Sequence, residues 1–182
     1  MSKQDLKKVK DASWNMDYGP GQQDPSKSYM HGMSDGSGNV FWGGGNEAHD
    51  RGEADKFIDE QVQAAQKAQA DWVAQGHTGI APNALTAFGN ALHTVTDRTS
   101  PVHQGEQPWA DNPWWHYKTI GHFLGEALGR SSSQVRSSDS AAQSLFQRTF
   151  VNSFDWVFFK NPCARTSGSY SQGNSTGWSG CQ

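Results

Sequence analysis

Two side chains suited to metal coordination lie four residues apart near the middle of this chain. His93 and Asp97 occupy positions i and i+4 of a segment with helical periodicity, so both leave one face about 6 Å apart. His103 follows beyond the helix break at Pro101. Neutral imidazoles and a carboxylate are a donor set that zinc prefers. We therefore expect a metal site organised around these residues; the alternative is a helix-capping Asp97 beside two hydrogen-bonded histidines.

A second histidine–acid pair repeats this spacing further along the chain. His122 and Glu126 are four residues apart on another predicted helix, with glycines beside them. Two antiparallel helices that each present such a pair can enclose a metal cavity in a bundle. His116 precedes His122 by six residues and faces another direction, so His122 is the favoured ligand. The alternative is an ordinary i,i+4 surface pair.

Further donor residues gather upstream, in a segment rich in small residues. Such a segment can bend around an ion, and its acids could orient a nucleophilic water. The same residues can equally form turns and helix N-caps. The candidates in this segment are His31, Asp35, Glu47, His49 and Asp50.

An aromatic segment follows His103. It could rim the site, seating an acyl chain or a choline-like head group by cation–π contact, or stacking a base. The alternative is that these rings pack the loop onto the helices. The candidates for substrate contact are Trp109, Trp114, Trp115 and Tyr117.

The elements that must position these residues are all helical, and the predicted class is all-α. Residues 1–50 are predicted to be mostly irregular, with a short helix over 5–12, and Gly89 is predicted to leave room for a ligand or ion. Apolar residues at helical spacing predict helices over about 53–75 and from Pro82 to the break at Pro101. Further helices are expected over 114–128 and 140–160, joined by a linker or cap at 131–140. We expect one domain over 1–162 and a Ser/Gly-rich tail over 163–182.

Composition narrows the function classes. The net charge of -3 argues against a protein held on nucleic acid by a basic face. No apolar run is long enough for a membrane span, and the N-terminus lacks the apolar stretch of a signal peptide. Cys163 and Cys181 are either free thiols or one disulfide. A Phe stripe at 146, 150, 154 and 158 is interpreted as core, with membrane insertion as the alternative.

The run from Phe88 to His103 resembles the central motif of the zinc-dependent phospholipase C family, which is related in fold to the S1/P1-type nucleases. In both, a glycine precedes His-x-x-x-Asp, and the pattern continues through a proline to a second histidine. The resemblance implies an all-α bundle holding one to three zinc ions. It implies the ligands His93, Asp97, His103, His122 and Glu126, with Asp35, His49 and His31 as further ligands.

The resemblance implies hydrolysis of phosphodiesters, with Asp35 and Asp97 as catalytic residues beside zinc. Phospholipid is the favoured substrate and a nuclease is the alternative; a membrane-inserting or binding module with a structural metal is the alternative from another class. The Tyr29–Met33 segment and the Pro101–Gly105 continuation also resemble C-terminal toxin modules of bacterial Rhs-type secreted proteins. That implies delivery into a target cell without a signal peptide, or else a cytoplasmic protein, and a cognate immunity protein.

Overall fold

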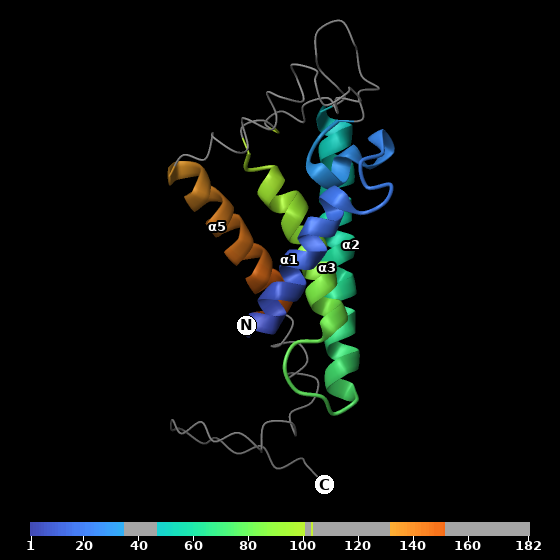
Figure 1. Cartoon of the computed structure of the whole chain (residues 1–182), viewed down its shortest axis with the longest axis vertical. Helices are drawn as coiled ribbons and strands as arrows, with labels where there is room; N and C mark the ends of the chain where they lie inside the picture. The colour runs from blue at the N-terminus through green and yellow to red at the C-terminus, as the bar shows by residue number, and fades with distance from the viewer. Residues whose placement is uncertain (35–46, 101–102, 104–131, 152–182) are drawn as a thin grey trace, which may run out of the picture.

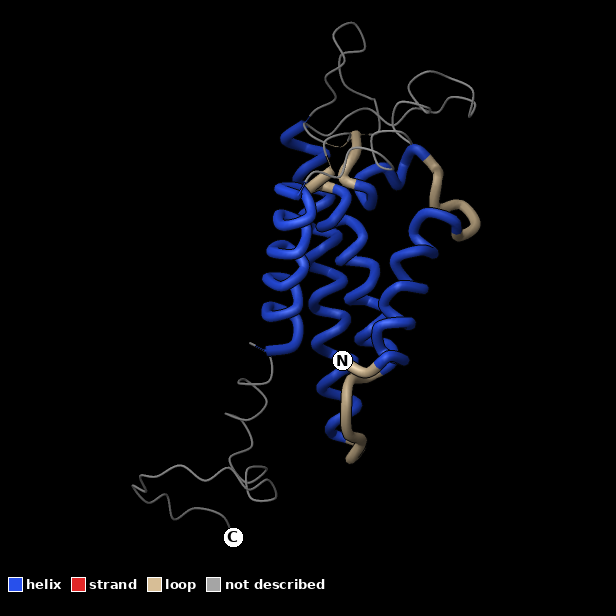
Figure 2. Tube along the Cα trace, turned by 60° about the vertical axis from the view of Figure 1, so that its left-hand side comes forward, coloured by secondary structure: helices blue, strands red, loops and turns tan. Residues whose placement is uncertain are grey.

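The computed structural model describes residues 1–34, 47–100, 103 and 132–151. Helices α1 (Lys3–Tyr18), α2 (Glu47–Ala74) and α3 (Pro82–Asp97) lie side by side (Figure 1). A 3-10 helix, η1 (Pro25–His31), joins the upper end of this group, and α5 (Ser132–Phe146) continues into a π-helical turn, η2 (Gln147–Val151). Figure 2 shows that the described part is helices joined by loops. The all-α prediction is therefore confirmed for these residues.

Helix α1 is longer than the sequence predicted. A capping box starts it: the Asp5 backbone N–H donates to Ser2 Oγ, and the Ser2 backbone N–H donates to the Asp5 carboxylate. Val9, Ala12 and Met16 form a narrow buried stripe against α3. The short-helix prediction was wrong because three apolar residues in a polar stretch give a weak periodic signal, while packing on α3 extends the helix to Tyr18.

Helix α2 matches the prediction closely at its end. Ile58, Val62 and Ala65 are buried at helical spacing, as expected. The helix stops in a Schellman arrangement: the N–H of His77 donates to Trp72 O, and that of Gly76 donates to Val73 O. Gly76 has φ +79°, a conformation that suits glycine. The turn after Gly76 leads the chain back into α3.

Helix α3 is the central element of the core. Pro82 stands at its start, as predicted, and α1, α2 and α5 all pack on it. Leu85, Phe88 and Ala91 are buried there, and the Phe88 ring meets those of Phe146 and Phe150 at centroid distances of 5.9 and 5.4 Å. These two phenylalanines of the predicted stripe are therefore core residues.

Helix α5 begins in a stretch that was predicted to be a linker or cap. Serines dominate its first turns, which gives little helix propensity, yet the element is anchored by buried Leu145 and Phe150 at its other end. Arg148 also pairs with Asp59 of α2 at 2.6 Å. The helices predicted over 114–128 and beyond residue 151, and the tail over 163–182, lie outside the described residues.

No helix in the described part has both the length and the apolar character of a membrane span.

Candidate metal centre

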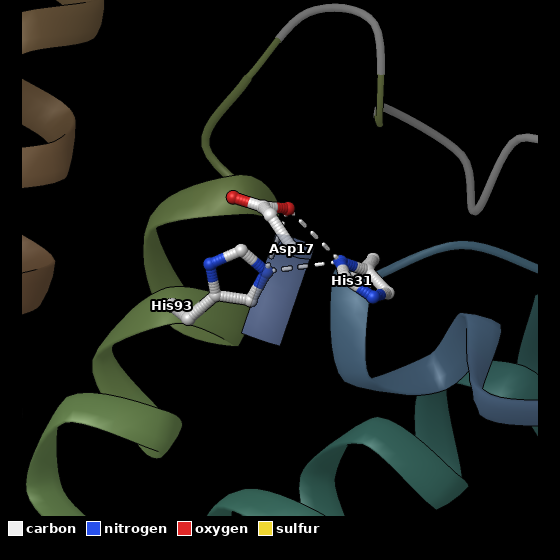
Figure 3. Close-up of side chains that lie close together, drawn as sticks. All are labelled: Asp17, His31 and His93. Atoms are coloured by element: carbon white, nitrogen blue, oxygen red, sulfur yellow. Dashed lines mark hydrogen bonds and ion pairs between the residues drawn. The ribbon is translucent and has the colours of Figure 1, made fainter. Parts of the chain in front are cut away.

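Three side chains from three segments meet at the upper end of the bundle. The ring nitrogens His93 Nε2 and His31 Nδ1 are 2.9 Å apart, and Asp17 Oδ1 lies 3.5 Å from the first and 3.6 Å from the second (Figure 3). These three residues could hold a metal ion, because each offers one ligand atom and these atoms all lie within 4.8 Å of one another. Ligand atoms at about 2.0–2.1 Å from a tetrahedral zinc ion stand about 3.3–3.4 Å apart, which the three distances bracket.

Asp97 adjoins this group. Its Oδ2 is 3.1 Å from His93 Nε2 and 3.8 Å from His31 Nδ1. The predicted i,i+4 pairing of His93 and Asp97 is therefore present, and both side chains face the same imidazole of His31. The Asp97 carboxylate can complete a two-histidine, two-aspartate set or bind a water beside it.

Close helix packing brings Asp17 to the group. A Cβ atom at Gly89 would lie 2.6 Å from the Val9 carbonyl oxygen and 2.7 Å from Ala12 Cβ. Gly89 therefore lets α1 and α3 approach closely, whereas the sequence interpretation assigned it to making room for a ligand. Asp17, five residues after Ala12, and His93, four residues after Gly89, face each other.

The turn that carries His31 is held at both ends. Asp24 caps η1, and hydrogen bonds from the Ser26 side chain and backbone lower the pKa of Asp24. Gly32 ends the turn with φ +60°, where a Cβ would collide with Arg98 Cγ. His31 is thus the last residue of a turn that cannot extend further.

Two residues in or after α3 donate hydrogen bonds to the backbone of η1. Thr94, fully buried, donates its hydroxyl to the Met30 carbonyl oxygen, and His103 Nδ1 donates to the His31 carbonyl oxygen at 2.6 Å. The His31 ring is fixed as well, because its Nε2 donates to the Gln22 carbonyl oxygen at 3.3 Å. That bond leaves His31 Nδ1 as the lone-pair atom directed at the group, the arrangement that outer hydrogen bonds give to metal-binding histidines.

Electrostatics also favour a cation here. Asp17 lies in the last turn of α1 and Asp97 is the last residue of α3, and neither last turn contains a basic residue. A helix C-terminus carries partial negative charge, so an acid there is unfavourable unless a cation compensates it. Two such acids converge on two histidines at this point.

The group is closed on one side and open on another. The side chains of His31 and His93 are 3% and 5% exposed, whereas those of Asp17 and Asp97 are 42% and 18% exposed. Solvent and a small ligand therefore reach the group past the carboxylates, while the imidazoles are fixed in the protein interior.

The other predicted site residues divide into two groups. His103 is buried against His31, and His49 is exposed on the first turn of α2 with Nδ1 3.4 Å from Asp50 Oδ1. Neither belongs to the group of three within the described residues, so their roles as ligands stay predictions. Asp50 is buried, and its Oδ2 has no hydrogen-bond partner in the described part. The remaining candidates lie outside the described residues: Asp35, Trp109, Trp114, Trp115, Tyr117, His122 and Glu126.

Asp17 was missed by the sequence interpretation. The available signal was an acid in the last turn of a helix, but that signal appears only when α1 is recognised to reach Tyr18. The pairing of Asp17 with His93 also depends on the α1–α3 crossing, which no local pattern reports.

Compared with protein-family models, curated proteins and solved structures, the chain matches none. A function for this chain must therefore be inferred from its own residues and the geometry of the site.

Proposed function

We propose that this chain is a zinc-dependent phosphodiester hydrolase that acts on phospholipid head groups. The observation that carries the proposal is the convergence of Asp17, His31 and His93, with Asp97 beside them. The resemblance of the 88–103 segment to the zinc-dependent phospholipase C family supports the choice of reaction.

Zinc fits the donors better than magnesium or calcium. Two of the three ligand atoms of the group are imidazole nitrogens, whereas hard cations prefer oxygen ligands throughout. When bound, zinc supplies a Lewis acid and lowers the pKa of coordinated water to about 7. By the resemblance, His103, His49, Asp35, His122 and Glu126 remain candidate ligands for one or two further ions.

The exposure of each side chain suggests its role in the proposed reaction. The buried imidazoles of His31 and His93 hold position, since their rings are fixed by the surrounding packing and by the Gln22 carbonyl. The half-exposed carboxylate of Asp17 marks the open side, where a phosphodiester can enter. We assign Asp97, with an oxygen 3.1 Å from His93 Nε2, to orienting a water and accepting its proton.

Phospholipid is the substrate class that charge favours. The chain is acidic overall, with a net charge of -3, whereas a polynucleotide substrate calls for a basic track along its backbone. By the separate resemblance of the Tyr29–Met33 and Pro101–Gly105 segments to Rhs-type toxin modules, the chain acts as a toxin domain delivered into a target cell and neutralised by a cognate immunity protein. Burial of Phe150 in the core, with the partly buried Phe146 packed against it, counts against the alternative in which this stripe inserts into a membrane.

The test combines metal content with hydrolysis. Purified chain should contain at least one zinc ion by elemental mass spectrometry and should hydrolyse bis(p-nitrophenyl) phosphate. His93→Ala should lose both properties. The matched control is His77→Ala, because the His77 ring stacks on Trp72 at the far end of α2 and has no part in the site.

The substrate class is then assigned by comparing phosphatidylcholine vesicles with single-stranded DNA and RNA. Release of phosphorylated head group supports the proposal, while cleavage of nucleic acid alone would replace it with a nuclease. Zinc bound without hydrolysis of any of these substrates would leave a structural metal in a binding module.

A further inference from the structure

Two large aromatic side chains stand on the outer face of α1, beside the metal centre. Trp14 and Tyr18 are 63% and 67% exposed, and their rings stack with centroids 4.1 Å apart. Neither is needed by the core, since α1 buries Val9, Ala12 and Met16 on its opposite face. Exposing two adjoining aromatic rings costs apolar hydration, so a contact that covers them is favourable.

Lysines continue the same line of residues along the helix. Lys3, Lys7, Lys10, Trp14 and Tyr18 follow one another at intervals of three or four, so they form one exposed stripe, which we name the α1 stripe. Lys7 pairs with Asp11, whereas Lys3 and Lys10 have no ion pair in the described part. Cationic charge therefore lies at one end of the stripe and aromatic surface at the other.

The net charge of α1 is opposite in sign to that of the whole chain. Helix α1 holds four of the fifteen basic residues, Lys3, Lys7, Lys8 and Lys10, against three acids, so its net charge is +1 in a chain whose net charge is -3. An exposed basic and aromatic face on an acidic protein indicates a partner with a negative surface and an apolar layer beneath it.

The stripe also lies next to the open side of the site. Tyr18 follows Asp17 directly, and Asp17 is the more exposed of the two carboxylates. Figure 1 shows α1 in front of α3. A flat surface that covers Trp14 and Tyr18 would therefore meet the protein beside the entrance to the metal centre.

We propose that the α1 stripe binds an anionic phospholipid surface, with Trp14 and Tyr18 in the interface and Lys3 and Lys10 on the lipid phosphates. Indole and phenol rings suit the boundary between head groups and acyl chains, and lysines near such a surface add electrostatic attraction. The convex face of one helix fits a flat surface better than a single nucleic-acid strand, which binds in a basic groove. This inference rests on the proposed function for its substrate but concerns a different surface.

The test is co-sedimentation of zinc-free protein with vesicles, so that binding is measured without hydrolysis. The parent should bind vesicles of phosphatidylcholine mixed with phosphatidylglycerol more tightly than vesicles of phosphatidylcholine alone. Trp14→Ala with Tyr18→Ala, and separately Lys3→Glu with Lys10→Glu, should each weaken binding by about tenfold or more.

The control variants change exposed apolar side chains and lysines on other helices. Val73→Ala with Val135→Ala removes exposed apolar side chains of α2 and α5, and Lys56→Glu with Lys67→Glu reverses charge on α2. Both control pairs should bind like the parent. Circular dichroism on all variants confirms that the helices remain.

Three outcomes overturn the inference: no vesicle binding by the parent, equal binding by the stripe variants, or a dimer in solution that Trp14→Ala with Tyr18→Ala dissolves. The two proposals fail separately. Hydrolysis of bis(p-nitrophenyl) phosphate without vesicle binding would refute lipid binding by the α1 stripe and leave the hydrolase proposal standing. Vesicle binding that depends on the stripe residues, without any hydrolysis, would refute the hydrolase proposal and leave lipid binding by the α1 stripe standing.

Discussion

The two halves of the α1–α3 pair are buried to a similar degree, but the buried side chains of α3 are apolar in the first half and include polar ones in the second. In the first half, Val9 and Ala12 of α1 pack beside Leu85 and Phe88 of α3, and the contact is apolar. In the second half, one turn beyond the Gly89 crossing, the buried residues of α3 are His93 and Thr94.

This difference shows how the molecule separates stability from chemistry. In the first half only helices pack against each other, and their backbone groups are already hydrogen-bonded, so apolar side chains fill the space between them. In the second half η1 enters, and its backbone carbonyls and His31 demand polar partners from α3. Substitutions in the first half should therefore act on stability, and substitutions in the second half should act on metal binding.

Phe88→Ala and His93→Ala should separate the two halves most sharply. Phe88→Ala opens a cavity in the apolar half and should lower the free energy of unfolding by about 3–5 kcal/mol. His93→Ala should instead abolish zinc binding and lower the free energy of unfolding of the zinc-free protein by less, about 1–3 kcal/mol, because it removes the hydrogen bond to His31. Urea unfolding and elemental analysis of both variants measure the contrast. Loss of zinc binding in folded Phe88→Ala would contradict it.

Gly89→Ala tests the crossing that divides the halves. The added methyl group would press on the Val9 carbonyl and Ala12, which should cost about 1–3 kcal/mol and move Asp17 away from His93. Zinc affinity, measured by competition with a chelator, should fall together with stability. Gly52→Ala is the control: nothing lies near its Cβ position, and alanine in this helix should stabilise by about 0.5–1 kcal/mol.

Thr94→Val should weaken the centre without touching a ligand. It removes the hydrogen bond to Met30 but keeps the volume, so stability should fall by about 1 kcal/mol. Because the turn that carries His31 loosens, zinc affinity should fall by about 10–100-fold, as for other residues that support metal ligands. Thr86→Val, on an exposed face of the same helix, should leave zinc affinity unchanged. Equal zinc affinities for Thr94→Val and the parent would show that the hydrogen bond from Thr94 to Met30 is not needed to position His31.

Asp5 and Asp17 sit at opposite ends of α1 and should respond in opposite directions. Asp17→Asn removes a negative charge from a helix C-terminus, so the zinc-free protein should gain about 0.3–1 kcal/mol, while stabilisation by zinc is lost. Asp5→Asn weakens the capping box and should destabilise the protein at neutral pH. Thermal melts with and without zinc distinguish the two.

The pH dependence of the Asp5 contribution has a definite sign. Hydrogen bonds from the Ser2 backbone and side chain lower the pKa of Asp5 below its ordinary 3.8. Its contribution to stability is therefore complete above pH 3.8 and disappears as the pH falls through the lower folded-state pKa. The stability difference between the parent and Asp5→Asn should accordingly shrink only in that acidic range.

The sequence predicted those parts of the molecule that local patterns determine. Leu85, Phe88 and Leu92 repeat at helical spacing, and Pro82 marks a helix start, so α3 and its His93–Asp97 pair could be located. Asp17 could not, because its role depends on two helices crossing at Gly89, far away in the chain. The Ser-rich start of α5 was missed for a related reason: packing of Leu145 and Phe150 outweighs weak local propensity.

His31 and His93 are 62 residues apart in the chain, although their ring nitrogens almost touch. An ion shared by these two histidines would close a loop of that length, as a disulfide does. By the chain-entropy relation for such loops, the cross-link would be worth on the order of 4 kcal/mol against the unfolded chain. The site would then form only after α3 has folded against α1 and η1, so the nascent chain carries Asp17 and His31 without an assembled centre until α3 has been made and packed.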